Sequence, residues 1–329
     1  MNVLKRGTGM LLGKFMPPHL GHVYLIDFAR HYCEDLTVLM CSIEREPIPG
    51  ALRYQWMQEL CAGVRLIHVT DEVPQEPSEH PGFWPIWHDL IRRHIPHGPD
   101  YVFASEPYGQ ELADLLGAEF VPVDLQRELV PVSGTEIRNN PMGYWRYIPD
   151  VVRPHYIRRI CLFGPESTGK TTLAARLARR YDTVAVHEYA RHLLEPKNGV
   201  CEYDDIERIA RGQRAAEEAL ARQANRVLFC DTDLVTTTIW SDVLFDKVPG
   251  SIVAAAEKRT YDLYLLMDID IPWVDDEQRY LPDEREAFMA RCKEELERRE
   301  RPYALISGDY DERFERACHA VDALMVKEG

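Results

Sequence analysis

The sequence has no long hydrophobic segment. Its apolar runs are short, as in YLLMDI at residues 264–269, whereas a helix that spans a membrane needs about 20 apolar residues. The opening residues, MNVLKRGTGMLLGKF, contain only a few consecutive apolar residues, so we expect no signal peptide. A composition with 45% hydrophobic and 28% charged residues is instead typical of an ordinary globular protein.

Closely spaced cysteine pairs are also missing. None of the eight cysteines stands in a C-x-x-C arrangement, and several lie in apolar runs that are typical of strands. Disulfide frameworks and zinc sites depend on spacings that this sequence does not contain. We therefore expect reduced thiols and a cytoplasmic protein.

Positive charge is scarce, because 39 Lys and Arg residues stand against 54 Asp and Glu residues, giving a net charge of −15. An acidic surface repels the phosphate backbone of nucleic acid, so we expect neither nucleic acid nor a membrane as a partner. Small anionic substrates remain compatible, since a few Arg or Lys residues in one loop are enough to bind them. Assembly into a homo-oligomer stays open.

What the sequence does contain is a regular alternation of short apolar runs with helical patterns. Its 329 residues are enough for two domains. In the first half, the alternation predicts a parallel sheet with helices on both faces. The expected strands are residues 10–12, 36–42, 65–69, 101–105 and 119–123, and the expected helices are 21–33, 53–61, 87–94 and 108–116.

The second half repeats this alternation, with expected strands at 160–163, 183–187, 226–230, 261–267 and 304–307, and helices at 170–181, 204–224, 284–299 and 312–326. Between the halves, IPDVVRPHYIRR combines prolines with basic residues and marks a domain boundary. The predicted fold class is α/β, with two different domains in tandem at residues 1–153 and 154–329.

A phosphate-binding loop opens the second half. GPESTGKTT at residues 164–172 fits the P-loop pattern G-x-x-x-x-G-K-[ST], between an expected strand and an expected helix. We expect Lys170 to reach the β- and γ-phosphates of ATP, and the Thr171 hydroxyl to hold Mg²⁺. The predicted nucleotide-binding residues of this loop are Gly164, Glu166, Ser167, Thr168, Gly169, Lys170, Thr171 and Thr172.

Carboxylates follow two neighbouring strands of the second half. Asp231 ends the strand in RVLFCD, where P-loop enzymes place a second Mg²⁺ ligand; helix capping is the alternative for it and for Asp233. Glu188 in HEYAR begins a helix and could accept the proton of an acceptor hydroxyl, or serve only as an acid at a helix start.

A charged segment, DIDIPWVDDEQRYLPDER, follows the fourth strand of the second half. Such a segment can close over a phosphate that is being transferred, and we predict Arg279 as its catalytic cation. Solvated surface is the alternative. Trp273 could stack on a flat substrate ring or simply pack.

The first half contains its own glycine-rich loop, GKFMPPHLGH at residues 13–22. Its H-x-x-H spacing raises zinc as an option, but no further ligands with a suitable spacing are nearby. The alternative is phosphate: prolines hold His19 rigid, His22 begins a helix, and Gly13 allows close backbone approach. Two imidazoles there can stabilise charge on a pentacoordinate α-phosphate and on leaving pyrophosphate.

This loop resembles the (H/T)xGH signature of the nucleotidyltransferase superfamily, and VSGTEIR at residues 132–138 is similar to the superfamily's second motif. The resemblance implies a Rossmann-like domain that transfers a nucleotidyl group from a nucleoside triphosphate to a phosphate. It implies that Ser133 and Thr135 bind the triphosphate at a helix N-terminus and that Arg138 clamps the β- and γ-phosphates. It also implies nucleotide contacts by Gly13, Lys14 and Phe15.

The order of the two halves resembles NadR-type proteins, and so do the segments FASEPYG, RYQWMQEL, GPESTGKTTLA and HEYAR. Such proteins combine nicotinamide-nucleotide adenylyltransferase with ribosylnicotinamide kinase. The resemblance implies ATP and Mg²⁺ as cofactors, nicotinamide riboside and its mononucleotide as substrates, and NAD as product. With aromatic residues chosen as ring stackers, the predicted substrate-binding residues are Arg53, Trp87, Tyr108, Glu188, Arg191 and Trp273.

Two other functions stay open. One is a pantetheine-phosphate or flavin adenylyltransferase fused to a different small-molecule kinase, and the other is a nucleotide sensor without catalytic activity. Some NadR-type proteins also carry an N-terminal helix-turn-helix, for which we see no counterpart here, so we expect no regulator activity. The sequence departs from the family at Pro18 and at DDEQR, where a glycine is expected; the second departure affects the placement of Arg279.

Overall fold

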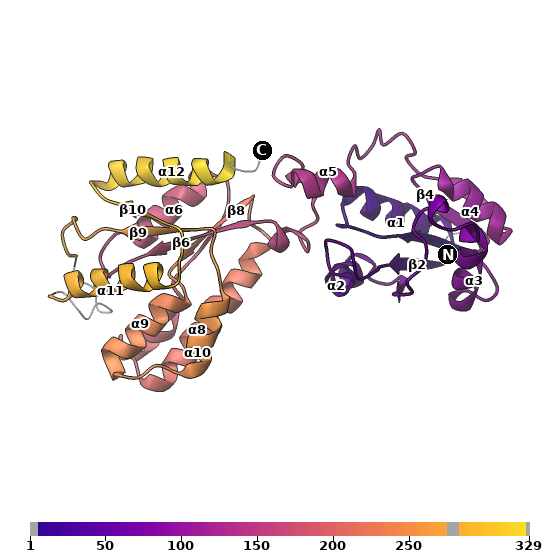
Figure 1. The fold of residues 1–329 in the computed structure, drawn as a ribbon. Coiled ribbons are helices and arrows are strands. Elements are labelled where there is room, and N and C mark those ends of the chain that lie inside the picture. The colour runs from indigo at the N-terminus through magenta and orange to yellow at the C-terminus, as the bar shows by residue number, and fades with distance from the viewer. Residues whose placement is uncertain (1–5, 275–282, 327–329) are drawn as a thin grey trace. The chain divides into compact units, whose positions relative to one another are not determined.

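The computed structural model describes residues 6–274 and 283–326. The chain forms two compact units, Met1–Val152 and Arg153–Gly329, each with one parallel five-stranded sheet and its helices (Figure 1). The predicted α/β class with two tandem domains is confirmed. The division lies one residue before the predicted one. In the described part of the chain, no helix combines the length and hydrophobicity needed to cross a membrane.

The first unit has a parallel sheet in the order β3-β2-β1-β4-β5. Its strands are β1 (Thr8–Gly13), β2 (Asp35–Cys41), β3 (Arg65–Val69), β4 (Tyr101–Ala104) and β5 (Glu119–Pro122). Its helices are α1 (Leu20–Tyr32), α2 (Gly50–Leu60), α3 (Phe83–His94), α4 (Tyr108–Leu116) and α5 (Gly134–Asn139). The winding direction reverses between β1 and β4, and ligands of such sheets bind outside the carboxyl ends of the strands at that point.

The middle strand β1 shows how the sequence builds this core. Consecutive Met10 and Leu11 are fully buried and belong to different clusters, because successive side chains of a strand point to opposite faces. Leu11 clusters with Ile26 of α1, whereas Met10 clusters with Leu90 of α3 and Leu112 of α4. A strand covered on both faces therefore reads as a continuous apolar run.

The second unit has the order β10-β9-β6-β8-β7, again parallel. Its strands are β6 (Arg158–Phe163), β7 (Ala185–Val186), β8 (Val227–Asp231), β9 (Leu263–Met267) and β10 (Tyr303–Ile306). Its helices are α6 (Lys170–Arg180), α7 (Tyr189–Leu194), α8 (Tyr203–Ala221), α9 (Leu234–Phe245), α10 (Gly250–Lys258), α11 (Arg285–Arg298) and α12 (Tyr310–Val326). The winding reverses at β6, so the predicted P-loop also lies at a switch point.

Helices α9 and α10 were not predicted, and β7 is shorter than the expected strand 183–187. α9 contains three consecutive threonines, which have low helix propensity. In the structure these threonines are buried, and the Thr238 hydroxyl donates to the carbonyl oxygen of Val235 at 2.7 Å. Asp233 caps the helix by accepting the Thr236 N–H at 2.8 Å. Burial and capping therefore override propensity.

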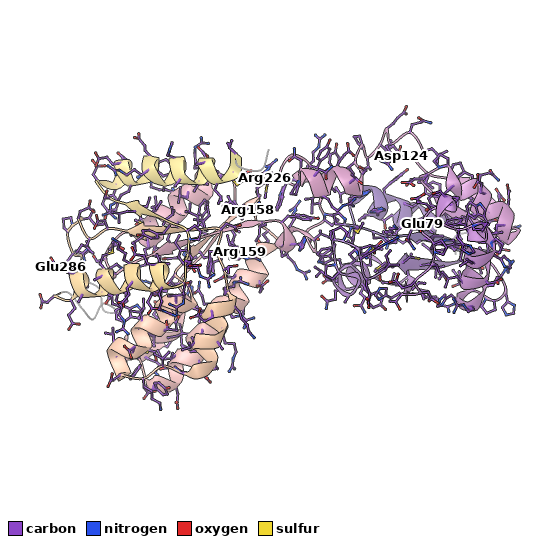
Figure 2. All side chains as sticks on the ribbon, in the orientation of Figure 1. Glu79, Asp124, Arg158, Arg159, Arg226 and Glu286 are labelled. Atoms are coloured by element: carbon purple, nitrogen blue, oxygen red, sulfur yellow. The ribbon has the colours of Figure 1, made fainter. Side chains whose placement is uncertain are left out.

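The basic cluster that marked the domain boundary lies where β6 begins. Figure 2 shows Arg158, Arg159 and Arg226 close together there. Arg158 forms an ion pair with Asp262 at 3.0 Å, and the backbone N–H of Arg159 donates to the same carboxylate at 2.8 Å. The Arg158 N–H also donates to the Arg226 carbonyl oxygen at 2.8 Å. This cluster therefore joins strand ends.

Candidate active sites

The loop after β6 has the backbone of a phosphate cradle. Gly164 (φ +134°), Ser167 (φ +55°) and Gly169 (φ +80°) all have positive φ. A Cβ atom at Gly164 would lie 2.9 Å from the carbonyl oxygen of Met267, so only glycine fits there. Such turns direct neighbouring N–H groups into one concave space, which is a geometry that binds anions.

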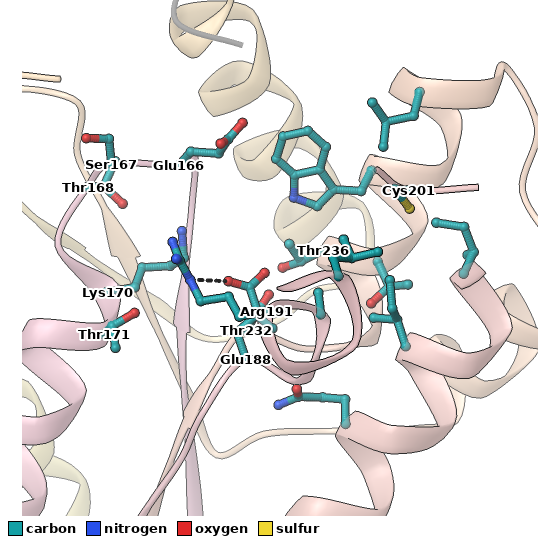
Figure 3. A pocket seen from close by; sticks show the side chains of 18 of the residues that line it. Glu166, Ser167, Thr168, Lys170, Thr171, Glu188, Arg191, Cys201, Thr232 and Thr236 are labelled. Carbon is teal, nitrogen blue, oxygen red and sulfur yellow. Dashed lines mark ion pairs between the residues drawn. The ribbon is translucent and has the colours of Figure 1, made fainter. Parts of the chain in front are cut away.

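Lys170 lies across this loop. Its Nζ donates hydrogen bonds to the carbonyl oxygens of Gly164 at 3.0 Å and Pro165 at 2.7 Å. The ammonium group therefore stands beside the concave space, as contact with phosphate requires. The loop faces a cavity of about 160 Å³ (Figure 3). The predicted loop residues that line this cavity are Glu166, Ser167, Thr168, Gly169, Lys170, Thr171 and Thr172.

Asp231 and Thr171 lie next to each other at the ends of β8 and the start of α6. The Thr171 hydroxyl donates to Asp231 Oδ2 at 2.5 Å, and the Asp231 side chain is buried. Asp231 Oδ1 is also buried and has no hydrogen-bond partner among the described residues. Burial raises the pKa of Asp231, and the nearby Lys170 ammonium opposes that shift. A buried carboxylate oxygen left without a donor fits a divalent cation.

The described residues contain no cluster of three or more His, Cys, Asp or Glu side chains suited to a metal. Mg²⁺ does not need such a cluster, because it commonly keeps several waters and binds one or two protein groups together with substrate phosphates. Thr171 and Asp231 therefore fit Mg²⁺.

Glu188 precedes α7 and lines the same cavity as Lys170. Its side chain makes no capping hydrogen bond; Arg191 Nε lies 3.7 Å from Glu188 Oε2 (dashed line in Figure 3). Burial, followed by the charge of Asp231, raises the pKa of Glu188, and Lys170 and Arg191 oppose the shift. Arg191 also lines the cavity, as predicted. The geometry is therefore that of a cavity carboxylate rather than a helix cap.

The other wall of this cavity comes from α8 and α9, and sequence reasoning missed it. Ile206 and Ile209 of α8 and Trp240 of α9 line the cavity together with Thr236 and Thr237. The Trp240 ring packs 4.7 Å from the ring of Phe288 on α11. The tryptophan could have been noticed only if α9 had been predicted as a helix after Asp231.

Three residues that the sequence suggested for the kinase site are not found among the described residues of the cavity wall. Trp273 does not line the cavity; its ring faces the Arg285 guanidinium at 5.8 Å, so the structure gives no support to ring stacking on substrate. Arg279 lies outside the described residues. Asp233 caps α9 and accepts a hydrogen bond from the Tyr264 hydroxyl at 3.0 Å, which is the capping alternative.

The first unit has a wider cavity of about 940 Å³ at the ends of β1 and β4. Two histidines lie in it around the start of α1. The His19 N–H donates to His22 Nδ1 at 3.2 Å, and the two rings stack at 3.6 Å. Because Nδ1 of His22 accepts a backbone proton, the neutral ring carries its own proton on Nε2 and is a hydrogen-bond donor there.

Both histidines are neutral near pH 7. Burial, with the charge of Arg127 as a second cause, lowers the pKa of His19 to about 4. Burial and the neighbouring His19 and Arg127 lower the pKa of His22 well below its ordinary value. The Nδ1 atom of His19 is itself buried, at the side of the ring that faces the first turn of α1. The two imidazoles are therefore uncharged hydrogen-bonding groups in the wall of this cavity.

The second motif meets the first loop at this cavity. Arg138 donates to the Met16 carbonyl oxygen and to the Thr135 hydroxyl, the latter at 2.9 Å. Ser133 caps α5 in a capping box with Glu136, whose carboxylate accepts the Ser133 hydroxyl at 2.7 Å. The Ser133 hydroxyl is thus occupied within the chain, although the residue lines the cavity as predicted.

Most of the remaining predicted residues of the first unit line this cavity, namely Gly13, Lys14, Phe15, His19, His22, Trp87, Tyr108, Thr135 and Arg138. Trp87 and Tyr108 are nevertheless anchored to backbone, because the Trp87 indole N–H donates to Pro74 O at 2.9 Å and the Tyr108 hydroxyl to Leu12 O at 3.2 Å.

Arg53 requires a correction. Its side chain is fully buried and does not line the cavity. It donates to the carbonyl oxygens of Ile48 at 3.0 Å and Lys14 at 2.5 Å, and it forms an ion pair with Glu46. Arg53 therefore supports the first loop from behind, and we no longer assign it to substrate.

Arg127 lines the first cavity and was missed. It forms an ion pair with Glu106 at 3.0 Å and acts on the pKa of both histidines. Asp124 holds this loop by accepting the N–H groups of Glu128, Leu129 and Val130 at 2.9, 3.2 and 3.1 Å. The sequence pattern does not indicate that Arg127 lies at the cavity, because DLQRE is typical of an ordinary charged loop.

Comparisons with known proteins agree with a two-unit arrangement. A family model described as an AAA domain matches residues 159–313. The Trifunctional NAD biosynthesis/regulator protein NadR of Escherichia coli (strain K12) is 30% identical over 98% of this chain and 84% of that protein. The protein of the same name from Salmonella typhimurium is also 30% identical, over 99% of this chain and 85% of its own.

Two solved structures share the fold along nearly the whole chain. A NadR protein in complex with NR gives a TM-score of 0.76 at 23% identity, covering 99% of this chain and 97% of the other. A NadR protein in complex with NAD and AMP-PNP gives a TM-score of 0.78 at 22% identity, covering 98% and 97%.

Proposed function

The chain belongs to the NadR family, and on this premise we propose that it is a bifunctional enzyme of NAD salvage. It phosphorylates nicotinamide riboside with ATP to give nicotinamide mononucleotide, NMN. It then joins NMN to the AMP part of a second ATP, giving NAD and pyrophosphate. Each step handles its own triphosphate, which explains why one chain has two phosphate-binding cavities. We assign the kinase to residues 154–329 and the adenylyltransferase to residues 1–153.

In the kinase step, the 5′-hydroxyl oxygen of the riboside bonds to the γ-phosphorus of ATP. The bond from that phosphorus to the β,γ-bridging oxygen breaks, and ADP leaves. Lys170 binds the β- and γ-phosphates from across the loop. Glu188 orients the hydroxyl and takes its proton, a role for which a carboxylate pKa raised toward neutrality is suited.

Arg191 keeps the Glu188 carboxylate in place through their ion pair. Trp240, Ile206 and Ile209 form an apolar wall of the same cavity, against which a flat pyridine ring can pack. Thr171 and Asp231 are the residues that would hold Mg²⁺. When bound, the ion neutralises charge on the phosphate oxygens.

In the adenylyl transfer step, a phosphate oxygen of NMN bonds to the α-phosphorus of ATP, and the bond to the α,β-bridging oxygen breaks. The Nε2–H of His22 donates to the oxygens that gain charge, and His19 lines the same wall. Arg138, fixed between Met16 and Thr135, binds the pyrophosphate that leaves. Neither step needs a covalent intermediate, because positioning and charge stabilisation suffice.

The observation that carries this proposal is the pair of cavities in a chain that aligns over almost its full length with NadR proteins. Each cavity combines a phosphate-binding loop with charged or hydrogen-bonding side chains that suit one of the two steps.

A coupled assay tests the proposal. The purified chain is incubated with nicotinamide riboside, ATP and Mg²⁺, and NAD, ADP and pyrophosphate are quantified. We expect NAD and pyrophosphate in equal amounts throughout, and ADP in the same amount once the riboside and NMN are fully converted. Release of pyrophosphate with pantetheine phosphate or flavin mononucleotide, but not with NMN, would assign another adenylyltransferase. No turnover with any of these substrates would indicate a nucleotide sensor.

A further inference from the structure

The P-loop depends on more than its own sequence, because side chains hold its carbonyl groups. The Pro165 carbonyl accepts the Thr168 hydroxyl at 2.8 Å. The Ser167 carbonyl accepts Arg285 from the start of α11 at 3.3 Å. The Thr168 carbonyl accepts the guanidinium of Arg313, 145 residues further along in α12, at 2.9 Å.

Arg313 is among the largest fully buried side chains of the described structure. Besides the Thr168 carbonyl, it donates to the carbonyl oxygens of Gly308 at 2.7 Å and Asp268 at 3.0 Å, and it forms an ion pair with Asp270. The guanidinium thus joins the P-loop to the segments that follow β9 and β10. A buried charge is tolerated only when it is paired and hydrogen-bonded in this way.

These contacts affect the groups that would face phosphate. In a planar trans peptide, the C=O of one residue and the N–H of the next point in opposite directions. A Thr168 carbonyl held toward buried Arg313 therefore turns the Gly169 N–H the other way, and a Ser167 carbonyl held by Arg285 does the same for the Thr168 N–H. Both Thr168 and Gly169 line the cavity.

We propose that Arg313 is a positioning residue of the kinase site, which fixes the P-loop amides toward the phosphates of ATP, with Arg285 in a weaker second role. The inference rests on the proposed kinase activity of the second unit. Lysine should replace Arg313 only in part, because its single ammonium lacks the planar fork that reaches several acceptors in different directions.

The experiment uses the full chain with Arg313→Met, Arg313→Lys and Arg285→Met. Arg313→Met should raise the KM for ATP in riboside phosphorylation by about tenfold, as expected when one oriented hydrogen bond is lost. Arg313→Lys should be intermediate, and Arg285→Met should show a smaller rise. Adenylyl transfer to NMN by the same preparations should stay unchanged.

Arg299→Met is the matched control. Arg299 is a similarly buried arginine of the same unit, with 3% of its side chain exposed, and it pairs with Glu257 and Glu295 rather than with the P-loop. A purely structural role for Arg313 would lower stability and the fraction of active protein, which reduces kcat without changing KM. The control should therefore match Arg313→Met in melting temperature but keep the KM for ATP.

A second readout does not depend on turnover. Amide hydrogen exchange of the peptide covering residues 164–172 is measured with and without ADP and Mg²⁺. ADP should slow exchange in the unmodified chain and in Arg299→Met, but much less in Arg313→Met. If the chain protects this peptide with ADP yet never phosphorylates the riboside, the proposed function fails while the role of Arg313 remains testable.

An unchanged KM and full ADP protection in folded Arg313→Met would overturn the proposal, and so would an equal KM rise in Arg299→Met. If Arg313→Met does not fold, the proposal is tested with Arg313→Lys and Arg285→Met instead. The KM for ATP and the protection of residues 164–172 by ADP are measured in the same way. If neither variant then changes the KM for ATP or the protection by ADP, the proposal is wrong.

Discussion

The two cavities offer different groups to the phosphates that we propose they bind. The second unit presents a tight loop with three positive φ values at a cavity of about 160 Å³. The first unit instead presents side chains, among them His19, His22 and Arg138, around a cavity of about 940 Å³. We attribute the difference to the transferred group, because a terminal γ-phosphoryl fits a closed loop, whereas an α-phosphorus needs space for a nucleotide on both sides.

The charges differ as well. The kinase cavity combines the cation Lys170 with the partly buried carboxylate of Glu188, and the buried carboxylate of Asp231 lies behind Thr171 of the cavity wall; burial raises the pKa of both carboxyl groups. The adenylyl transfer cavity holds two neutral imidazoles whose pKa values burial lowers. The first arrangement suits proton removal from a hydroxyl, which the phosphate nucleophile of the second step does not require.

The largest effect is expected from Lys170→Ala. Loss of the cation on the β- and γ-phosphates should lower riboside phosphorylation by about 10³-fold, in line with the loss of a preorganised charge-stabilising group. Adenylyl transfer to NMN should stay unchanged, because Lys170 belongs to the other unit. ADP and pyrophosphate release are measured on one preparation, with the exposed Lys293→Ala as control. Loss of both activities in folded protein would disprove the two-site assignment.

His22→Ala should produce the opposite pattern. Without the Nε2–H donor, adenylyl transfer should fall by about 10²–10³-fold, while phosphorylation of the riboside continues. The intermediate should then accumulate as NMN, which chromatography detects directly. His88→Ala changes a partly exposed histidine of α3 that does not line the cavity, and it should leave both activities as they are. Normal NAD formation by His22→Ala would remove the imidazole from the mechanism.

Glu188→Gln tests whether the kinase step, unlike adenylyl transfer, needs a group that takes a proton. The amide keeps the shape but cannot take a proton, so kcat for riboside phosphorylation should fall by about 10²-fold with KM values retained. In the unmodified enzyme, Glu188 must be ionised, so kcat should fall as the pH drops through its pKa, which lies above the ordinary 4.5. The variant should lose this acid limb. Near-normal turnover would leave Glu188 only as a helix-start residue.

The smallest effect concerns stability in acid. His19 has an ordinary pKa of 6.5 in the unfolded chain and about 4 in the fold, so between these values the unfolded state binds more protons. The free energy of unfolding of the first unit should therefore decrease from pH 6.5 down to pH 4, by at most about 3 kcal/mol for this group. His19→Gln should flatten the dependence, as denaturant unfolding at several pH values would reveal. An unchanged slope would mean that His19 is protonated in the fold.

Much of the fold could be predicted because the signals are local. The apolar runs of β1 and β8 and the P-loop pattern each depend on a few consecutive residues, and they indicated parallel sheets with phosphate loops at their ends. Helix α9 was not predicted because its threonines have low helix propensity, and the helix is stabilised by burial of these residues and by the Asp233 cap. Trp240 was missed with it.

The candidate sites divide in the same way. The sequence by itself indicated both loops, since glycines together with a lysine or histidines at fixed spacing can be read from neighbouring positions. Only the tertiary structure decided that Arg53 lies behind its loop rather than in the cavity, and that Arg127 and Arg313 reach the sites from distant segments. The physical reason is that a side chain's partners depend on which strand ends meet at the sheet's edge, and that juxtaposition is not encoded in any short stretch of the chain.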